Sequence, residues 1–273
     1  VDGRSSPGAG AQDASSFLPL RRVAVGEDTW APRAKTYADA LENSRDYRQL
    51  LDTVIRQGLP GRFLYGQVIL STCRNLREDY ADLPGQPAES NRQQQARDLM
   101  VARCASFSDD EVALDTSSEF AKDPRVADDP YKRWLREWES HAFEADARKR
   151  LLIAAFDTSD PLLLDNMDTL FARPGSDSKF FDGQEYARSD AVQALGLAWK
   201  AAACEGTGTS CGQDDPWVME ACAARNECHA DRFELFEAIV RERSGADGAN
   251  LYDQLYEKFV DAIQRHDTSV FMQ

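Results

Sequence analysis

The stretch AACEGTGTSCGQDDPWVMEACAARNECH (Ala202–His229) holds four of the six cysteines of the 273-residue chain. The alanine-rich segment that runs into it, Gly183–Cys204, has apolar residues at helical spacing. Asp215 followed by Pro216 is typical of the start of another helix. Segments 230–243 and 249–265 then repeat the helical spacing. The stretch therefore predicts a helical fold in which disulfides close short loops.

Glycine and spacing favour local disulfides within this stretch. Three glycines between positions 206 and 212 let the chain fold back after a helix, which would bring Cys204 to Cys211. Cys222 and Cys228 can close a second local loop. Four cysteines allow three pairings, however, so Cys204 with Cys222 stays open as an alternative.

The two earlier cysteines, Cys73 and Cys104, form the third predicted disulfide. Both are expected near the C-terminal ends of successive helices. In a simple antiparallel hairpin those ends lie apart, beyond the roughly 7 Å limit between Cα atoms for bridging. The long connection 79–89 would let the second helix cross the first at an angle and bring the two residues together. Three disulfides favour a location in the periplasm or outside the cell.

Two other interpretations of the stretch are weaker. Structural zinc sites use close C-x2-4-C pairs, whereas six residues separate Cys204 from Cys211 and five separate Cys222 from Cys228. GTSCG (Gly208–Gly212) matches G-x-S-x-G, but a nucleophile elbow needs a strand before its serine, and a helix is predicted there. The sequence therefore predicts no metal, no cofactor and no catalytic residue.

Capping signals extend the helical pattern toward the N-terminus. They are Ser44, Ser90 with Gln93, Ser108 with Glu111, Asp129 with Pro130, and Asp160 with Pro161. Between them the apolar residues fall at helical spacing, and no stretch shows the alternation and turn residues of a β-hairpin. The predicted segments include a helix from Ser108 through DEVALDTSSEFA and one running from Pro130 to Leu152.

We expect an all-α fold of about ten helices, arranged as a right-handed, solenoid-like stack of helical hairpins. Segments 51–73 and 168–204 share an order of apolar helix, turn, aromatic pair and helix ending in cysteine, which indicates a duplicated hairpin. Residues 1–16 are predicted to be a flexible tether, and residues 17–273 a single helical domain. Within it FLPLRRVAV (Phe17–Val25) is predicted to be an extended segment lying on the domain.

Charge limits the classes of partner. The chain has 32 lysines and arginines against 47 aspartates and glutamates, a formal net charge of -15. Nucleic acids and anionic membranes are bound through lysine and arginine, so the balance argues against both. No apolar run approaches the roughly 20 residues of a membrane span. A basic protein or a cation is the more plausible partner, and solubility alone is the alternative explanation of the charge.

The cysteine pattern also carries a resemblance. The motifs AAC…SC…EAC…NEC, GRFLYGQVILSTC and ARCASFSDDEV resemble those of an uncharacterised group of secreted or lipid-anchored helical proteins of Gram-negative bacteria. The resemblance covers most of the chain after about Tyr37. It implies export, allows a lipid anchor upstream, and brings neither an activity nor a catalytic residue.

Other candidate chemistry is less specific. Carboxylate pairs are frequent in so acidic a chain, and spacing does not reveal whether two of them face each other across a cleft. Glu137, His141 and Glu144 can share a helix face, but the Glu-x-x-His pattern of ferritin-like metal sites is absent. Phe180 and Phe181 lie in a segment expected to be a loop, where one of them would be exposed and mark a contact site.

The predicted function is that of an exported, non-enzymatic helical protein that binds another protein, for example as an immunity or inhibitor protein for a basic partner. Helical stacks offer extended concave surfaces for such binding. The binding residues are expected in acidic helix starts, Asp109, Asp110, Asp214 and Asp215, together with Phe180 and Phe181. The alternative is a cell-envelope polysaccharide hydrolase that uses a carboxylate pair.

Overall fold

The structure is a computed structural model that describes residues 31–82, 85–113, 119–167, 170–173, 176–209 and 211–272. Of residues 31–36, 173, 176 and 177 it describes the backbone only. The predicted tether 1–16 and the predicted extended segment Phe17–Val25 lie outside the described residues. Helices make up most of the described part, which confirms the all-α class.

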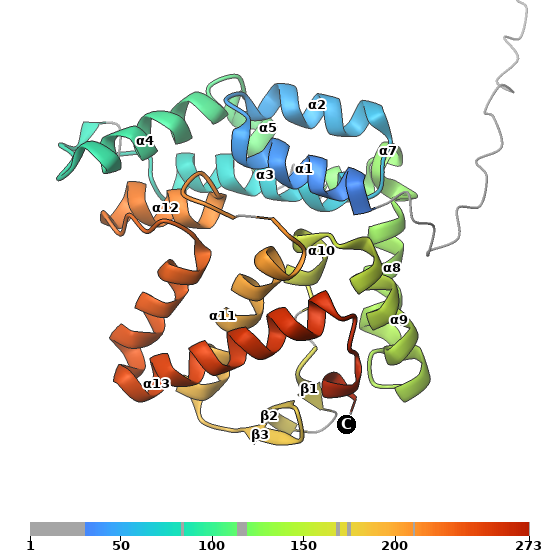
Figure 1. Ribbon diagram of the computed structural model, residues 1–273. Coiled ribbons are helices and arrows are strands. Elements are labelled where there is room, and N and C mark those ends of the chain that lie inside the picture. The colour runs from blue at the N-terminus through green and yellow to red at the C-terminus, as the bar shows by residue number, and fades with distance from the viewer. Residues whose placement is uncertain are drawn as a thin grey trace, which may run out of the picture.

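The first half of the chain forms one layer of helices, with a helical hairpin along its edge (Figure 1). The layer contains α1 (Ala31–Asn43), α2 (Tyr47–Gln57), α3 (Arg62–Glu78), α4 (Asn91–Cys104) and α5 (Asp109–Val112). The short α7 (Pro124–Ala127) leads into the hairpin, which consists of α8 (Pro130–His141) and α9 (Ala145–Thr158).

The second half forms the other layer. It contains α10 (Pro161–Asp165), α11 (Ser189–Gly206), α12 (Pro216–Arg225), α13 (Arg232–Gln264) and a 3-10 turn, η2 (Ser269–Phe271). A small antiparallel sheet of β1 (Ala172–Arg173), β2 (Ser176–Phe181) and β3 (Gln184–Tyr186) precedes α11. One continuous cluster of buried hydrophobic residues joins the two layers.

The alanine-rich α11 packs along α13, as its small residues predict. Ala194, Ala198 and Ala202 are fully buried. At Gly206 a Cβ atom would lie 2.8 Å from the Cβ of Ile263 in α13, so only glycine permits this approach. Small side chains thus allow the two helices to pack closely and place α11 at the centre of the layer.

The last helix is two helices joined at a sharp bend (Figure 1). The backbone of Gly245 has φ 67° and ψ -162°, far from helical values. Figure 1 shows the segment before this residue leaving α12 and the segment after it returning along α11. The sequence predicts two helices here, 230–243 and 249–265, in agreement with the bend.

The sheet corrects the expectation of a loop around the two adjacent phenylalanines. Phe180 pairs with Glu185 and Phe181 with Gln184 in a tight hairpin. Successive residues of a strand point to opposite faces. Phe181 is therefore fully buried, with its ring 4.4 Å from that of Phe259, while Phe180 is only half-buried.

Two predicted helices are shorter than expected. The capping box at Ser108 forms, since its N–H donates to the Glu111 carboxylate at 2.9 Å, but α5 already ends at Val112. The segment from Pro130 to Leu152 is divided into α8 and α9 by a turn at residues 142–144. The structure also does not confirm a regular stack of hairpins, because α4 packs on α12 and α11 on α13, which are not consecutive.

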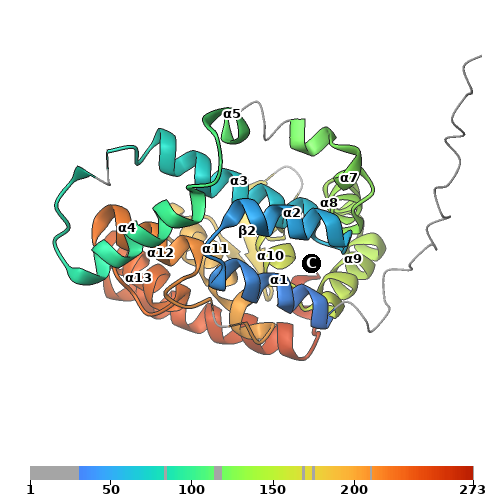
Figure 2. The ribbon, with the colours of Figure 1, turned by 90° about the horizontal axis from the view of Figure 1, so that it is seen from above.

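All three predicted disulfides are present. Their Cα–Cα distances are 5.3 Å for Cys73–Cys104, 5.8 Å for Cys204–Cys211 and 4.3 Å for Cys222–Cys228. The connection between α3 and α4 runs outward before α4 returns (Figure 2). The C-terminal end of α4 therefore meets the body of α3, which resolves the difficulty of a simple hairpin. Within the described residues no helix is long and apolar enough to span a bilayer.

Candidate functional site

The acidic start of α5 is exposed but paired with arginines. The Asp109 side chain is 91% exposed and forms an ion pair with Arg77 of α3. Its neighbour Asp110 is also exposed. Glu111 accepts a hydrogen bond from the Nε of Arg48 at 2.9 Å. These pairs offset part of the negative charge that the sequence suggests for this turn.

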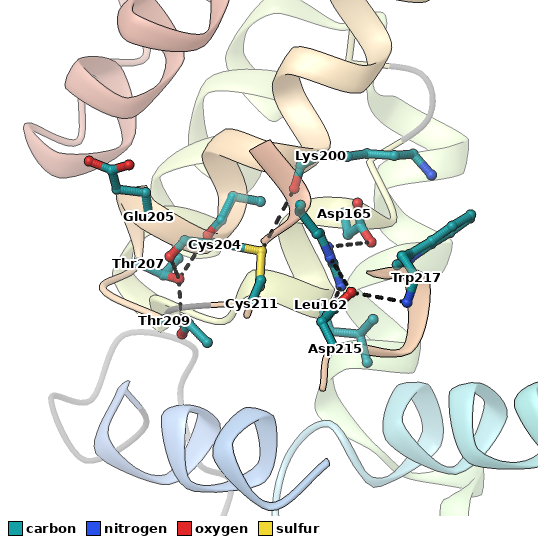
Figure 3. Close-up of a disulfide and its surroundings, with 12 residues drawn as sticks. Leu162, Asp165, Lys200, Cys204, Glu205, Thr207, Thr209, Cys211, Asp215 and Trp217 are labelled. Carbon is teal, nitrogen blue, oxygen red and sulfur yellow. Dashed lines mark hydrogen bonds and ion pairs between the residues drawn. A yellow bond between two sulfur atoms is a disulfide. The ribbon is translucent and has the colours of Figure 1, made fainter. Parts of the chain in front are cut away.

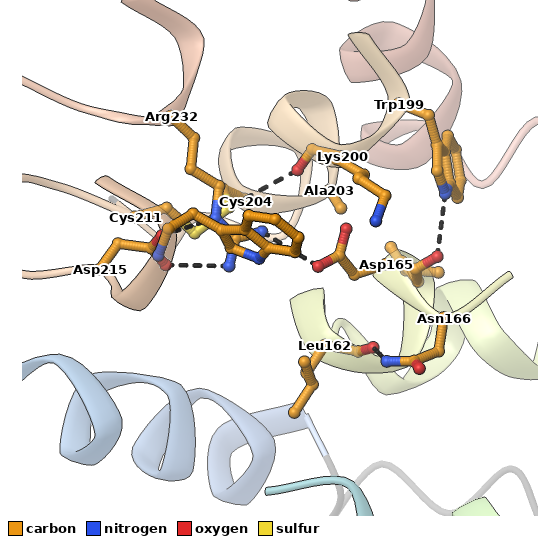
Figure 4. Close-up of polar contacts among 12 residues, drawn as sticks. Leu162, Asp165, Asn166, Trp199, Lys200, Ala203, Cys204, Cys211, Asp215 and Arg232 are labelled. Carbon is orange, nitrogen blue, oxygen red and sulfur yellow. Dashed lines mark hydrogen bonds and ion pairs between the residues drawn. A yellow bond between two sulfur atoms is a disulfide. The ribbon is translucent and has the colours of Figure 1, made fainter. Parts of the chain in front are cut away.

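The other predicted acidic pair is divided between the surface and the core. Asp214 is half-buried, whereas Asp215 is 2% exposed. The Asp215 carboxylate accepts hydrogen bonds from the Nε and Nη2 of Arg232, both at 2.9 Å, and from the Trp217 N–H at 3.0 Å (Figure 4). The prediction that Asp215 lies on an exposed acidic face is therefore wrong, because the carboxylate caps α12 and binds a buried arginine.

Arg232 connects α10, α12 and α13. It is 7% exposed, and its Nη1 lies 3.3 Å from Asp165 of α10 (Figure 4). Burial acts to lower the pKa of Arg232, but the carboxylates of Asp215 and Asp165 raise it above its ordinary value. The guanidinium therefore stays charged within the fold, where it is paired on two sides.

The Cys204–Cys211 loop turns directly at the end of α11 (Figure 3). The Thr207 hydroxyl donates to the carbonyl groups of Ala203 at 2.8 Å and Cys204 at 3.0 Å. Gly208 has φ +73°, a conformation that side chains disfavour, and so permits the turn. Helix α11 precedes this loop where a nucleophile elbow would need a strand, and Ser210 lies outside the described residues.

A groove lies between α4, α12 and the two disulfide-closed loops, with a volume of about 480 Å³. We call it the α4–α12 groove. Its apolar lining comes from Ala96, Leu99, Ala102, Met219 and Cys222, and its polar lining from Arg45, Arg92, Gln95, Asp98, Gln213, Asp214 and His229. Of the residues that the sequence singles out for partner binding, Asp214 lies in it, while Asp109 and Asp110 belong to α5.

Arginines of α4 attach this helix to the opposite wall of the groove. Arg92 donates to the carbonyl oxygen atoms of Cys228 at 2.8 Å and His229 at 2.5 Å. Arg97 donates to the carbonyl oxygen of Ala223 at 3.0 Å. Because a guanidinium presents several donors in a fixed plane, each arginine holds backbone of the second layer against α4.

A third arginine closes the other end of the same contact. Arg103 is 1% exposed and donates to the carbonyl oxygen of Asp214 at 3.0 Å and to that of Ser44 at 2.9 Å. The sequence does not predict this role, because nothing in the spacing of the arginines indicates backbone partners 59 and 111 residues away. The groove thus has walls fixed by disulfides and by charged donors.

The electrostatics of the groove are set by its loops. Residues 205–231 contain six acidic side chains and one arginine. Asp215 is neutralised by Arg232, but Asp98 and Asp214 line the groove itself. Arg92 also lines it, with its guanidinium held by backbone carbonyls, and Arg45 lies exposed at its margin. The loops around the groove are therefore predominantly acidic.

Two further grooves lie elsewhere. One, of about 370 Å³, runs between α8 and α9 and is lined by Trp134, Glu137, His141, Glu144, Ala147, Arg150, Leu151 and Ala154. The other, of about 460 Å³, lies among α2, α5 and α7 and is lined by charges of both signs. In the first groove the Nδ1 of His141 lies 2.9 Å from the Glu144 carboxylate. The two residues are therefore neighbours, but not on one helix face as predicted, because α8 ends at His141 and Glu144 is the N-cap of α9.

Three carboxyl groups of the described residues have raised pKa values and lie outside these three grooves. One is Asp253 of α13, whose pKa is raised by burial. Burial raises the pKa of Asp160 to about 6 against the opposing hydrogen bonds from the N–H groups of Leu163 and Leu162. Burial likewise raises the pKa of Asp129, which caps α8. Both side chains are fully buried helix caps, so neither offers a proton to a substrate in a groove.

One cluster has residue types that can bind a metal ion, but two of its three residues are already bound to other groups. Ligand atoms of Glu42, Cys211 and Asp215 lie within 4.8 Å of one another. The Cys211 sulfur is bonded to Cys204, and Asp215 is bound to the guanidinium of Arg232. A cation would have to displace a buried positive charge, so these residues do not fit a metal ion.

No family model, no curated protein and no solved structure matches the chain. The resemblance to secreted helical proteins of Gram-negative bacteria thus stays a prediction, and the functional proposal depends on the α4–α12 groove.

Proposed function

We propose that the protein binds another protein through the α4–α12 groove and that the partner contributes a basic segment. The net charge of -15 and the acidic loops 205–231 support a basic partner. Such a protein acts as an immunity or inhibitor protein, without chemistry of its own. The three disulfides support a place of action in the periplasm or outside the cell.

The observation that carries this proposal is that the walls of the groove are fixed before any partner arrives. Cys204–Cys211 and Cys222–Cys228 close the two loops, and Arg92, Arg97 and Arg103 hold them against α4. Ordering loops and side chains is one of the main costs of association. A groove that is already ordered binds with less of that cost.

The lining suggests how the partner is held. Ala96, Leu99 and Met219 provide an apolar floor against which an extended segment can bury apolar side chains. The carboxylates of Asp98 and Asp214 are placed to pair with lysine or arginine of the partner. Charge then determines the partner and the rate of association, while the floor contributes apolar burial.

The hydrolase alternative receives less support. A hydrolase of this kind needs two acids facing across a cleft, one of them with a raised pKa. Asp129 and Asp160 have raised pKa values but cap helices in the core. The grooves described above contain neither of them, nor do they contain Asp253, the third carboxyl group with a raised pKa.

The proposal is tested with two charge reversals of equal size. Partners are captured from a cell-envelope extract, identified, and their affinities measured at low and high salt. Asp98→Lys with Asp214→Lys should lower the affinity of the partner at least tenfold. Asp109→Lys with Asp110→Lys makes the same change of charge on α5 and should leave it within about twofold.

The affinity of the native protein should also fall as salt rises, because exposed charges are screened beyond about 8 Å at physiological ionic strength. Equal effects of the two charge reversals would contradict the proposal, since net charge rather than the groove would then govern binding. The proposal would also be contradicted if the set of captured proteins were unchanged by both charge reversals and by the salt concentration.

A further inference from the structure

The groove between α8 and α9 is a second surface that the proposed function does not use. It has an apolar floor of Trp134, Ala147, Leu151 and Ala154. Trp134 and Leu151 are nearly buried, and the indole N–H of Trp134 donates to the carbonyl oxygen of Leu151 at 3.1 Å. This bond ties α8 to α9 and fixes the width of the groove, which we call the α8–α9 groove.

Exposed apolar side chains lie on the same hairpin. Within the part of the chain that the structure describes, four large hydrophobic residues are exposed, and two of them are Phe143 at 49% and Ile153 at 39%. Phe143 is in the turn between the two helices, and Ile153 is on α9 next to the groove residue Ala154. An apolar groove with exposed apolar neighbours is typical of a surface that binds another segment.

We propose that the α8–α9 groove binds residues Phe17–Val25 of the same chain. The sequence FLPLRRVAV has apolar residues on both sides of Arg21 and Arg22. Pro19 disfavours a helix there, so the segment suits an extended conformation along a groove. Its apolar residues match the floor, and its two arginines match two carboxylates of the margin.

The charges of the groove favour this occupant. Glu137 and Glu144 line the groove and are exposed. Glu144 has a histidine beside it rather than a lysine or arginine. The guanidinium groups of Arg21 and Arg22 can therefore pair with both carboxylates. Arg150, which also lines the groove, has the same sign as the segment and disfavours the arginines beside it.

The segment is also within reach. Helix α1 begins at Ala31 and contacts α9, and Figure 1 shows the start of α1 on the side of the molecule where α8 and α9 lie. Five residues separate Val25 from Ala31, and the six Cα–Cα steps between them span up to about 20 Å when extended. That is about the length of α9, since each of its 14 residues adds about 1.5 Å.

Covalent attachment makes even weak binding sufficient. A segment joined by a short linker has an effective concentration on the order of 1 mM at its site. If the free segment binds with a Kd of about 0.1 mM, the bound state exceeds the unbound state about tenfold in the intact chain. The apolar segment and the exposed apolar side chains of the hairpin would then shield each other from water.

Trypsin cleavage of the intact, disulfide-bonded protein tests the proposal. Arg4 and Arg22 both precede α1 in the sequence, and Arg4 lies outside the proposed segment, so it serves as an internal reference. We expect cleavage after Arg22 to be about tenfold slower than after Arg4, as followed by mass spectrometry. Equal rates at the two sites would overturn the proposal.

Variants of the groove identify the surface responsible. Glu137→Lys with Glu144→Lys should raise the cleavage rate after Arg22 to that after Arg4, whereas Arg150→Gln should lower it further. Glu139→Lys is the matched control, because Glu139 is exposed on α8 but does not line the groove. All these side chains are exposed, so circular dichroism should show an unchanged fold. Loss of protection in Glu139→Lys as well would contradict the assignment.

A synthetic peptide of residues 15–27 provides an independent measurement. It should compete for the groove and accelerate cleavage after Arg22, and a scrambled peptide should not. Protection that grows with protein concentration would show instead that a second copy covers the groove, and would overturn the intrachain proposal. The α4–α12 groove takes no part in these experiments, so either proposal can fail alone.

Discussion

Arg232 shows at the scale of single residues what the sequence reveals and what it conceals. Asp215 followed by Pro216 correctly predicts a helix start, because Asp215 caps α12. The same sequence pattern does not show that the Asp215 carboxylate is buried. Its partner Arg232 follows 17 positions later, and Asp165, the second partner of Arg232, precedes Asp215 by 50 positions. Burial of a charge depends on contacts between distant segments, and spacing alone contains no record of them.

The pH dependence of stability is the prediction at this scale. Asp160 has a pKa raised by burial to about 6, above the 3.8 of an unperturbed aspartate. Its contribution to stability is therefore fully present below pH 4 and is lost as the pH rises through 6. Between pH 4 and pH 7 the loss amounts to about 3 kcal/mol. Asp160→Asn should keep the helix cap and remove this dependence of the free energy of unfolding on pH. Urea unfolding at a series of pH values measures it.

Asp46→Asn is the control with the opposite sign. Hydrogen bonding to the Gln49 N–H lowers the pKa of Asp46, which caps α2 at the surface. The contribution of Asp46 to the free energy of unfolding is present above pH 4 and is lost as the pH falls. Relative to the native protein, Asp46→Asn should therefore lose stability at high pH, whereas Asp160→Asn should gain it there. A parallel response of both variants would contradict the assignment of the raised pKa to Asp160.

At the scale of elements, prediction succeeds where a signal is local. Ser90 accepts a hydrogen bond from the Gln93 N–H at 3.1 Å, and Asp129 and Asp160 cap helices that begin with proline, all as the sequence indicates. The small sheet was missed because β1 and β3, with two and three residues, are too short to show alternation, and the six residues of β2, SDSKFF, do not alternate between polar and apolar. Its register depends instead on the burial of Phe181 against α13, a contact far along the chain.

Two glycine substitutions should have opposite effects on stability. Gly245 has φ 67° and ψ -162°, a conformation open almost only to glycine, so Gly245→Ala should cost about 1–3 kcal/mol. Gly196 lies within α11 with space for a Cβ atom, and Gly196→Ala should stabilise the protein by about 0.5–1 kcal/mol. Urea unfolding measures both values. Stabilisation by Gly245→Ala would mean that α13 is not bent at this residue.

At the scale of the whole molecule, composition and cysteine pattern predict the class of the fold but not its arrangement. Helical spacing identifies which residues of α4 and α12 are apolar, yet it does not indicate that these two helices pack on each other. The contact is completed by Arg92, Arg97 and Arg103 binding backbone carbonyls, which any residue can provide. The predicted stack of consecutive hairpins did not anticipate such a contact.

The disulfides should differ in their contributions to stability. In the chain-entropy model the Cys73–Cys104 loop, with a separation of 31 residues, is worth about 4 kcal/mol, and the Cys222–Cys228 loop, with a separation of six, about 2 kcal/mol. Replacing each pair by alanine and measuring urea unfolding should reproduce this order. Denatured, unreduced protein should titrate no thiols and reduced protein six. A larger loss of stability on removing the Cys222–Cys228 disulfide would show that packing in the native state outweighs the chain-entropy effect.

The pairing of α11 with α13 has a consequence for how the chain is made. Trp199 and Phe181 are covered by Phe259 and Phe271, which lie near the end of the described residues. During synthesis the aromatic core of the second layer therefore stays open until residue 271 has left the ribosome. Until then α11 packs on α10 but lacks its main partner, α13, and newly made chains expose this apolar surface.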